Sequence, residues 1–306
     1  MPGLAALNTD GSTCWDTMMH VSLPLVISPR DLPAMRASFR DIVVLDARPN
    51  QADFDVAHLD GAIHVDLNRH LSRASEMDFD PRFGGRHPLP SVERWSKLLG
   101  QWGVDPTTPV VIYDEQDCSN AAARAWWMLR SVGHKDVGVI DGGFRAAVAA
   151  GLSTSALKTE SAPKEPYPVD AWQLPTVDIQ AVEALRTDPA WKVLDVRSAP
   201  RFRGETEPID PIAGRIPGAV NLPFTQNLDG DRLRTAPALR GQYASLLKGT
   251  APERLIVHCG SGVTACQTLL ALEVAGFSGA SLYVGSWSEW CRNDMPRASG
   301  IDDSSM

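Results

Sequence analysis

The chain has 306 residues, of which 43% are hydrophobic and 22% charged, and its formal net charge is −8 at pH 7. This composition is ordinary for a globular protein, and the length suggests about two domains. The acidic balance argues against a protein that coats nucleic acid, and no run of about 18 apolar residues that could cross a membrane occurs. The five cysteines are thinly spread, and the N-terminus lacks a basic start followed by an apolar run. We therefore expect a cytoplasmic protein with reduced thiols.

The first half of the chain alternates short apolar runs with helical patterns. Runs rich in Val and Ile lie within residues 41–49, 109–116 and 137–146, and residues 121–132 keep apolar side chains at helical spacing. Short, wholly apolar runs of this kind are typical of strands buried in a parallel sheet. This half therefore predicts α/β units.

The second half repeats the same order of elements. Its apolar runs lie within residues 191–199, 253–259 and 280–290, and residues 265–275 have helical spacing. We predict an α/β fold with two tandem copies of one domain, each a mostly parallel sheet flanked by helices. The expected boundaries are a first domain at 21–151, a proline-rich linker at 152–175, a second domain at 176–297 and a polar tail at 298–306.

One loop carries the strongest chemical signal, Cys259-Gly260-Ser261-Gly262-Val263-Thr264-Ala265. It lies between a predicted strand and a predicted helix, where open α/β sheets bind their ligands. A nearby helix N-terminus favours a thiolate over a thiol. The glycines allow successive backbone N–H groups to surround an anion, so residues 260–265 are expected to form a backbone cradle. The loop predicts that Cys259 is an activated nucleophile.

Three other interpretations of this loop are weaker. A buried structural cysteine would not require the two glycines and the serine that follow it. A dinucleotide-binding fingerprint fits the G-x-G-x-x-A spacing, but too little chain remains for the rest of a nucleotide-binding sheet. A phosphatase of the Cys-x5-Arg type requires an arginine where this chain has Ala265.

Further motifs accompany the loop. They are HLDGA at 58–62, GGRHPLP at 84–90, RFRG at 201–204, RIPGAVNLPF at 215–224 and GSWSEW at 285–290. Together with the loop they resemble the tandem-domain rhodaneses, a family of sulfurtransferases, over nearly the whole chain. The CGSGVTA loop is similar to that of 3-mercaptopyruvate sulfurtransferases, whereas thiosulfate-type rhodaneses usually carry CRKGVT.

The resemblance implies a ping-pong sulfur transfer. Cys259 takes sulfur from a small anionic donor as a persulfide and passes it to a thiol, such as thioredoxin or a low-molecular-weight thiol, or to cyanide. No metal or organic cofactor, membrane or nucleic acid is implied. Two alternatives stay open: a thiosulfate:cyanide sulfurtransferase, and a non-catalytic rhodanese module that binds a partner or relays sulfur.

Comparison of the two halves provides an internal control. Aligning the run at 110–114 with that at 255–259 places Asp114 where Cys259 stands. A carboxylate cannot accept sulfane sulfur, so the first domain is expected to be catalytically silent.

Arginines in the second half are candidates for binding the donor. Arg197, Arg201 and Arg203 cluster on a chain that is acidic overall, and guanidinium groups bind carboxylates through paired hydrogen bonds. The resemblance implies that Arg201 binds the carboxylate of mercaptopyruvate. Arg197 and Arg203 are further candidates, with pairing to nearby acidic residues as the alternative.

The resemblance also implies a proton relay of Ser, His and Asp. Ser261 and His87 match the first two members, while the third position falls on Asn68, with Asp66 two residues away. Asn cannot stabilise an imidazolium as a carboxylate does. His87 therefore either takes part in proton transfer or only positions the substrate.

The identity of the donor depends on opposing signals. Asp210 stands near the place where the family carries a second arginine, which weakens the case for mercaptopyruvate. However, Gly260 and Ser261 supply no cation for dianionic thiosulfate, which favours mercaptopyruvate. Cys266 either resolves an oxidised Cys259 or packs in the core, and Trp287 and Trp290 either line the site or belong to the core.

Overall fold

The computed structural model describes residues 22–39 and 41–300. Three parts of the sequence predictions lie outside the described residues. They are the N-terminal segment, in which we found no leader pattern, the first residue of the predicted first domain and the end of the predicted tail. No helix in the described part of the chain combines the length and the apolar character needed to cross a bilayer.

The first half contains a five-stranded sheet whose neighbouring strands are all parallel, in the order β1-β6-β5-β2-β4. Its strands are β1 (Val26–Ile27), β2 (Val43–Asp46), β4 (Ala62–His64), β5 (Val110–Tyr113) and β6 (Val137–Ile140). The second half contains a parallel sheet in the order β10-β9-β13-β14-β8. Its strands are β8 (Thr176–Val177), β9 (Lys192–Asp195), β10 (Val220–Asn221), β13 (Leu255–His258) and β14 (Ser281–Tyr283). The predicted α/β fold with two copies of one parallel sheet is confirmed.

The two sheets correspond strand by strand. The central pair β2 and β5 places Tyr113 opposite Asp46, and the central pair β9 and β13 places His258 opposite Asp195. Asp114 and Cys259 are the next residues along the chain, so they occupy equivalent positions at the carboxyl ends of equivalent strands. This agrees with the alignment made from the sequence.

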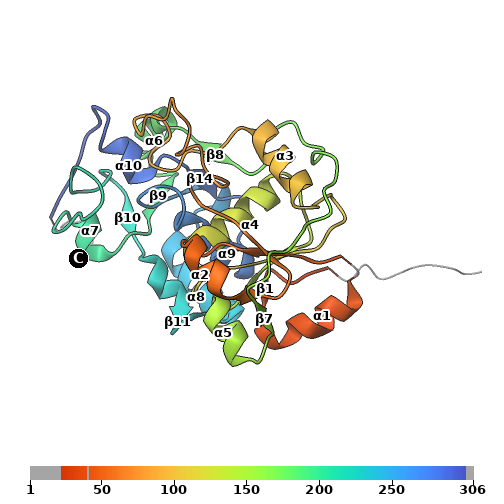
Figure 1. The fold of residues 1–306 in the computed structure, drawn as a ribbon. Helices are drawn as coiled ribbons and strands as arrows, with labels where there is room; N and C mark the ends of the chain where they lie inside the picture. The colour runs from red at the N-terminus through yellow and green to blue at the C-terminus, as the bar shows by residue number, and fades with distance from the viewer. Residues whose placement is uncertain (1–21, 40, 301–306) are drawn as a thin grey trace, which may run out of the picture.

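Helices cover the sheets of both halves (Figure 1). In the first half they are α1 (Leu32–Ser38), α2 (Gln51–Val56), α3 (Val92–Gln101), α4 (Ala121–Ser131) and α5 (Gly143–Ala149), with a 3-10 turn η1 (Pro29–Asp31). In the second half they are α6 (Ile179–Leu185), α7 (Ala199–Phe202), α8 (Ala236–Leu247), α9 (Ala265–Val274) and α10 (Ser286–Trp290), with η2 (Phe224–Asn227) and η3 (Pro252–Arg254). Two small antiparallel pairs, β3 (His58–Leu59) with β7 (Thr154–Ser155) and β11 (Leu228–Asp229) with β12 (Arg232–Leu233), complete the fold.

Helices α4 and α9 pack against each other at the centre of the molecule (Figure 1). Both are apolar around most of their circumference, which is typical of a helix buried on all sides. The large side chains Trp126 and Trp127 of α4 are buried, as are Leu270 and Leu272 of α9. These helices therefore join the two halves through a shared hydrophobic core.

The predicted linker lies along the first half. Its strand β7 pairs with β3, the N–H of Tyr167 donates to the carbonyl of Ser96, and the Tyr167 side chain is buried. Farther along, the N–H of Leu174 donates to Oγ of Ser131.

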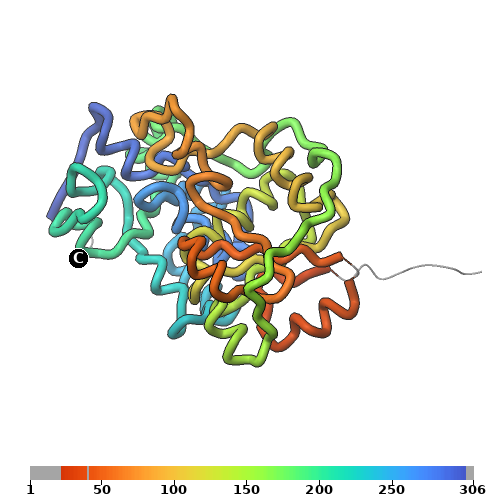
Figure 2. Tube along the Cα trace, in the orientation of Figure 1, coloured from red at the N-terminus to blue at the C-terminus, as the bar shows by residue number. Residues whose placement is uncertain are grey.

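A long segment of the first half, residues 68–90, reaches the second half. The N–H of Gly84 donates to Oε1 of Glu289 at 2.7 Å, and the N–H of Arg86 donates to Oγ of Ser288 at 2.9 Å. Gly85 has φ 74°, and a β-carbon there would collide with the carbonyl oxygen of Gly285, so only glycine allows this approach. Figure 2 shows this segment in orange, beside the blue chain around α10.

Candidate active site

Cys259 directly follows β13, and only 3% of its surface is exposed. Its N–H donates to Oγ of Ser286 at 3.1 Å, and its carbonyl accepts the N–H of Trp287 at 3.0 Å. Ser286 has φ 53°, a left-handed conformation that is uncommon outside glycine, and its hydroxyl also donates to the carbonyl of Tyr283. The start of α10 therefore fixes the backbone of the predicted nucleophile.

The loop after Cys259 turns tightly before α9 begins at Ala265. Gly262 has φ 72°, and a β-carbon at this position would collide with the carbonyl oxygen of Val284. Across residues 22–39 and 41–300, the backbone N–H groups of residues 260–264 donate no hydrogen bond to another protein group. They are thus available to an anion at the loop, as the predicted cradle requires.

The equivalent loop of the first half surrounds the carboxyl group of Asp114. Burial raises the pKa of the Asp114 carboxyl to about 7, although backbone N–H groups of Cys118, Asn120 and Gln116 act to lower it. The N–H of Cys118 lies 3.0 Å from Oδ1 of Asp114. The first copy therefore shows that this type of loop can direct backbone donors at an acidic group in the position of Cys259.

His87 and Ser261 come together from the two halves of the chain. Nδ1 of His87 lies 2.8 Å from Oγ of Ser261. Burial, assisted by the nearby Arg86 and Arg124, lowers the pKa of His87 to about 4, so the imidazole is neutral at pH 7. A neutral imidazole can hold the serine hydroxyl in place, but it is a weak base.

The predicted third member of the relay is not joined to this pair. Oδ1 of Asp66 accepts the N–H of Arg69 at 2.7 Å, and the carbonyl of Asn68 accepts the hydroxyl of Ser72. In the part of the chain that the structure describes, neither Asp66 nor Asn68 forms a hydrogen bond with His87. A role for either residue stays a prediction.

The predicted arginines differ in their surroundings. Arg201 binds Glu207 through Nη2 at 2.6 Å and Nε at 3.2 Å, and its side chain lies beside the loop, because a β-carbon built on Gly260 would be 3.5 Å from its Nη2. Arg203 pairs with the exposed Glu205 at 2.6 Å. Arg201 is thus the predicted arginine whose guanidinium the structure places next to the loop.

Arg197 forms a paired contact with Asp195, in which Nη2 and Oδ2 lie 2.6 Å apart. Arg48 and Asp46 make the same contact at equivalent positions of the first half, where the distance is 2.7 Å. Because the copy without the thiol also has this pair, it accounts for the presence of Arg197 without a substrate.

Two arginines that the sequence analysis missed reach the loop from the first half. Arg86 directly precedes His87, and a β-carbon built on Gly260 would lie 3.1 Å from its Nη2. Arg124 lies in α4 with 0% exposure, donating from Nη1 to the carbonyl of Gly262 and from Nη2 to that of His87, both at 3.1 Å. Burial lowers the pKa of Arg124, whereas negative charge on Cys266 or Cys259 acts to raise it. The only feature of the sequence that could have pointed to Arg124 is its position within an apolar helical pattern.

The remaining candidates are buried. Cys266 donates from Sγ to the carbonyl of Gly262 at 3.3 Å, and burial raises its pKa to about 12, so the thiol stays protonated at neutral pH. Trp287 and Trp290 belong to a core cluster of the second half, and Nε1 of Trp287 donates to the carbonyl of Ile212. No group of three or more His, Cys, Asp or Glu side chains suited to a metal ion occurs among the described residues.

Comparison with known proteins identifies the relatives of this chain. The model of the rhodanese-like domain matches residues 28–150 and again residues 178–293. A probable 3-mercaptopyruvate sulfurtransferase of Pseudomonas aeruginosa is 41% identical over 270 residues, which cover 84% of this chain and 92% of that protein. A thiosulfate sulfurtransferase of Gallus gallus is 32% identical over 256 residues, covering 82% and 84% of the two chains.

A solved structure shows the same fold. The 3-mercaptopyruvate sulfurtransferase from Leishmania major superposes with a TM-score of 0.74 at 27% sequence identity, covering 88% of this chain and 74% of that one. With two matches to one domain model, two equivalent parallel sheets and relatives aligned over most of its length, the chain belongs to the rhodanese-like domain family.

Proposed function

We propose that this protein is a sulfurtransferase that moves sulfane sulfur from 3-mercaptopyruvate to a thiol or cyanide through a persulfide on Cys259. The observation that carries the proposal is the equivalence of Cys259 and Asp114. The same loop surrounds a carboxyl group in one copy and a thiol in the other. A loop that offers free N–H groups to a thiolate also suits the persulfide anion that replaces it.

The geometry supports a balanced first step. The Cys259 thiolate attacks the sulfur of the donor, an S–S bond forms, and the C–S bond of the donor breaks. The electron pair of that bond leaves on carbon as the enolate of pyruvate, which takes up the proton of the donor thiol. To the Ser261 hydroxyl, which lies 2.8 Å from Nδ1 of His87, we assign the transfer of this proton or a hydrogen bond to the enolate oxygen.

The second step restores the enzyme. An acceptor thiolate attacks the outer sulfur of the persulfide, the S–S bond breaks, and its electron pair returns to Cys259 as thiolate. A reducing compartment would supply such acceptors, and we place the protein in the cytoplasm with thioredoxin or a low-molecular-weight thiol as its partner. The first domain, proposed at 21–151, serves the second, at 176–297, by supplying Arg86, His87 and Arg124 without chemistry of its own.

Mercaptopyruvate is the donor that the loop favours. Ser261 can donate to a carbonyl or enolate, the guanidinium of Arg201 lies beside Gly260 and can bind a carboxylate, and neither Gly260 nor Ser261 adds a charge. Relatives named 3-mercaptopyruvate sulfurtransferase support this choice. Thiosulfate is the second candidate, because Arg86 adds another cation beside Gly260 and other relatives are named thiosulfate sulfurtransferase.

The test measures pyruvate release from 3-mercaptopyruvate with a dithiol acceptor, and the intact mass after incubation with the donor alone. Wild-type protein should release pyruvate and gain the mass of one sulfur atom, and Cys259→Ser should do neither. Cys118→Ser is the matched control, since Cys118 lies in the copy without the nucleophile and a hydroxyl can keep its bond to the carbonyl of Ile140. Turnover by Cys259→Ser would disprove the role of the thiol. A folded wild-type protein inactive with every donor would favour a binding module.

A further inference from the structure

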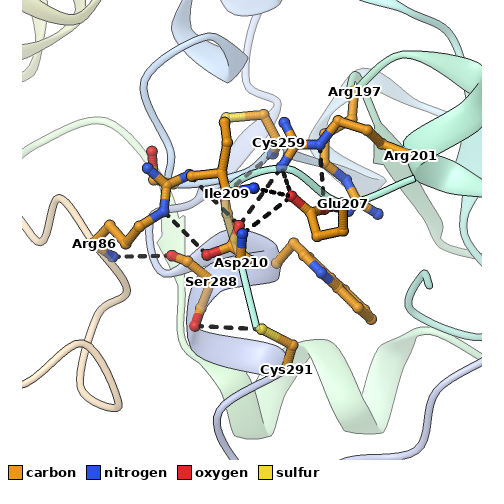
Figure 3. A network of polar contacts seen from close by, with 12 residues as sticks. Arg86, Arg197, Arg201, Glu207, Ile209, Asp210, Cys259, Ser288 and Cys291 are labelled. Carbon is orange, nitrogen blue, oxygen red and sulfur yellow. Dashed lines mark hydrogen bonds and ion pairs between the residues drawn. The ribbon is translucent and has the colours of Figure 1, made fainter. Parts of the chain in front are cut away.

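Asp210 is a buried carboxylate in contact with three arginines, two of which, Arg86 and Arg201, are labelled in Figure 3. Its side chain is 0% exposed, and its oxygens lie 2.8 Å from Nη1 of Arg292, 3.0 Å from Nε of Arg86 and 3.6 Å from Nη2 of Arg201. Its own N–H donates to Oε1 of Glu207, the carboxylate that also binds Arg201. We call these five residues, Arg86, Arg201, Arg292, Glu207 and Asp210, the Asp210 cluster.

The Asp210 cluster lies beside the nucleophile loop. Arg86 and Arg201 both approach Gly260, the residue after Cys259, as the contacts of a β-carbon built there show. In Figure 3 Arg86 approaches Asp210 from one side and Arg201 and Glu207 lie on the other, with Cys259 next to them. A donor whose sulfur reaches Cys259 must therefore place its negative charge close to these guanidinium groups.

The charges of the cluster do not cancel. Three guanidinium groups face the two carboxylates Glu207 and Asp210, which leaves one net positive charge. The neighbouring Arg197 also contacts Glu207, with Nη1 and Oε2 3.2 Å apart, but Asp195 is its main partner, and this Arg197–Asp195 pair adds no net charge to the cluster. Without Asp210, the same arginines would carry two net positive charges.

We propose that Asp210 is a specificity-determining residue, which lowers the charge of the anion site so that a donor with one negative charge is favoured over a dianion. This inference rests on the proposed function and concerns the choice between a 2-oxo acid and thiosulfate. The buried carboxylate fills positions on Arg86 and Arg201 that a second anionic group of a donor would otherwise occupy. Low exposure strengthens this competition, because water screens buried charges poorly.

A purely structural role for Asp210 predicts a different outcome. If the carboxylate only holds the three arginines in place, its removal should lower turnover of both donors by the same factor. If it sets the charge of the site, its removal should change the ratio of the two specificity constants. The ratio of kcat/KM for thiosulfate to kcat/KM for 3-mercaptopyruvate, with cyanide as the common acceptor, therefore separates the two roles.

The experiment compares wild-type protein with Asp210→Asn, Arg292→Gln and the double variant. We expect Asp210→Asn to raise the ratio of kcat/KM for thiosulfate to kcat/KM for 3-mercaptopyruvate at least tenfold, which is equivalent to about 1.4 kcal/mol. Arg292→Gln should lower this ratio. The double variant restores the net charge and should return the ratio to within about threefold of wild type. The double variant also keeps the test informative if Asp210→Asn, in which three arginines face only the carboxylate of Glu207, fails to fold. Glu205→Gln, which removes an exposed carboxylate from the same segment, is the control and should leave the ratio unchanged.

An unchanged ratio in Asp210→Asn and in Arg292→Gln, with activity toward either donor retained, would overturn the inference and leave the proposed function intact. Equal losses with both donors would show that Asp210 only holds the arginines. A wild-type protein that transfers sulfur from neither donor would instead remove the proposed function, and this inference with it.

Discussion

Nδ1 of His87 and Oγ of Ser261 lie 2.8 Å apart, although 174 positions separate the two residues in the chain. Each residue comes from a different copy of the fold, and the imidazole is neutral at pH 7 because burial lowers its pKa to about 4. The pair therefore works through one hydrogen bond that neither copy can form alone.

For this pair we expect strongly non-additive effects on turnover of 3-mercaptopyruvate. Ser261→Ala and His87→Ala should each lower kcat by roughly 10- to 100-fold, at or below the usual range for a lost proton-transfer group. The double variant should be no slower than the slower single variant, because both changes remove the same interaction. Additive losses would show that the two residues act separately. Asn68→Asp should change kcat by less than about twofold, because among the described residues Asn68 forms no hydrogen bond with His87.

The pH profile adds a second check on His87. A group whose pKa is about 4 does not titrate between pH 5 and 8. The contribution of Ser261 to kcat should therefore be constant over that range, and a step near pH 6.5 that disappears in His87→Ala would contradict the neutral imidazole.

Arg201→Ala should raise KM for 3-mercaptopyruvate. Loss of a charge-assisted hydrogen bond to a carboxylate costs about 1.5–3 kcal/mol, equivalent to roughly 10- to 150-fold in affinity. Arg203→Ala is the comparison, and we expect a smaller effect because its partner Glu205 lies in solvent. Equal increases in KM for the two variants would support the prediction that Arg203 also binds the donor, and an unchanged KM in Arg201→Ala would move the carboxylate site elsewhere.

Asp114→Asn should stabilise the protein at alkaline pH. Burial raises the folded-state pKa of Asp114 from 3.8 to about 7, so folding favours the protonated carboxyl. The wild-type protein therefore loses stability as the pH rises from about 4 to about 7, whereas asparagine has no such charge to bury. We expect a gain of about 1–4 kcal/mol in the free energy of unfolding at pH 8, and a smaller gain at pH 4. Urea titrations at both pH values measure it, and a larger gain at pH 4 would contradict the assigned shift.

Arg124→Met should slow alkylation of Cys259 by iodoacetamide at pH 7. Arg124 is a buried cation that feels the charge of Cys259, and within the described ranges no carboxylate pairs with it. A nearby cation favours the reactive thiolate, so we expect a decrease of roughly tenfold. Arg124→Lys keeps the charge and should retain more of the rate. Equal decreases in the two variants would indicate that the hydrogen bonds to the carbonyls of Gly262 and His87 matter more than the charge.

Much of the fold could be predicted because it depends on local patterns. The apolar run at 255–258 became β13, and the helical spacing at 265–275 became α9, one residue shorter than expected. The equivalence of Asp114 and Cys259 followed from the same repeated pattern. These features need only the preferences of neighbouring residues for a buried strand or helix.

The site was harder to predict because much of it depends on contacts between the two copies. Nothing near Arg86 in the sequence shows that Gly85 lets the chain approach Gly285, which brings the guanidinium next to Gly260. For Arg197 the sequence showed a local cluster of arginines, and only its counterpart Arg48 reveals that its ion pair with Asp195 is repeated in the first copy; a role of Arg197 in donor binding stays a prediction. Position along the chain cannot show which carboxylates each guanidinium binds or which guanidinium lies beside the loop.

The segment at 68–90, which carries Arg86 and His87 to the loop of Cys259, bears on why a duplicated chain would retain a copy without a nucleophile. After duplication, the first copy could lose its thiol without loss of function, provided that it kept residues 68–90, which complete the site of the second copy. Selection would then act on the position of residues 68–90 and no longer on a nucleophile at the position of Asp114. On the proposed function, catalysis would depend on both halves, because the half without the thiol supplies Arg86 and His87 to the loop of the half that bears it.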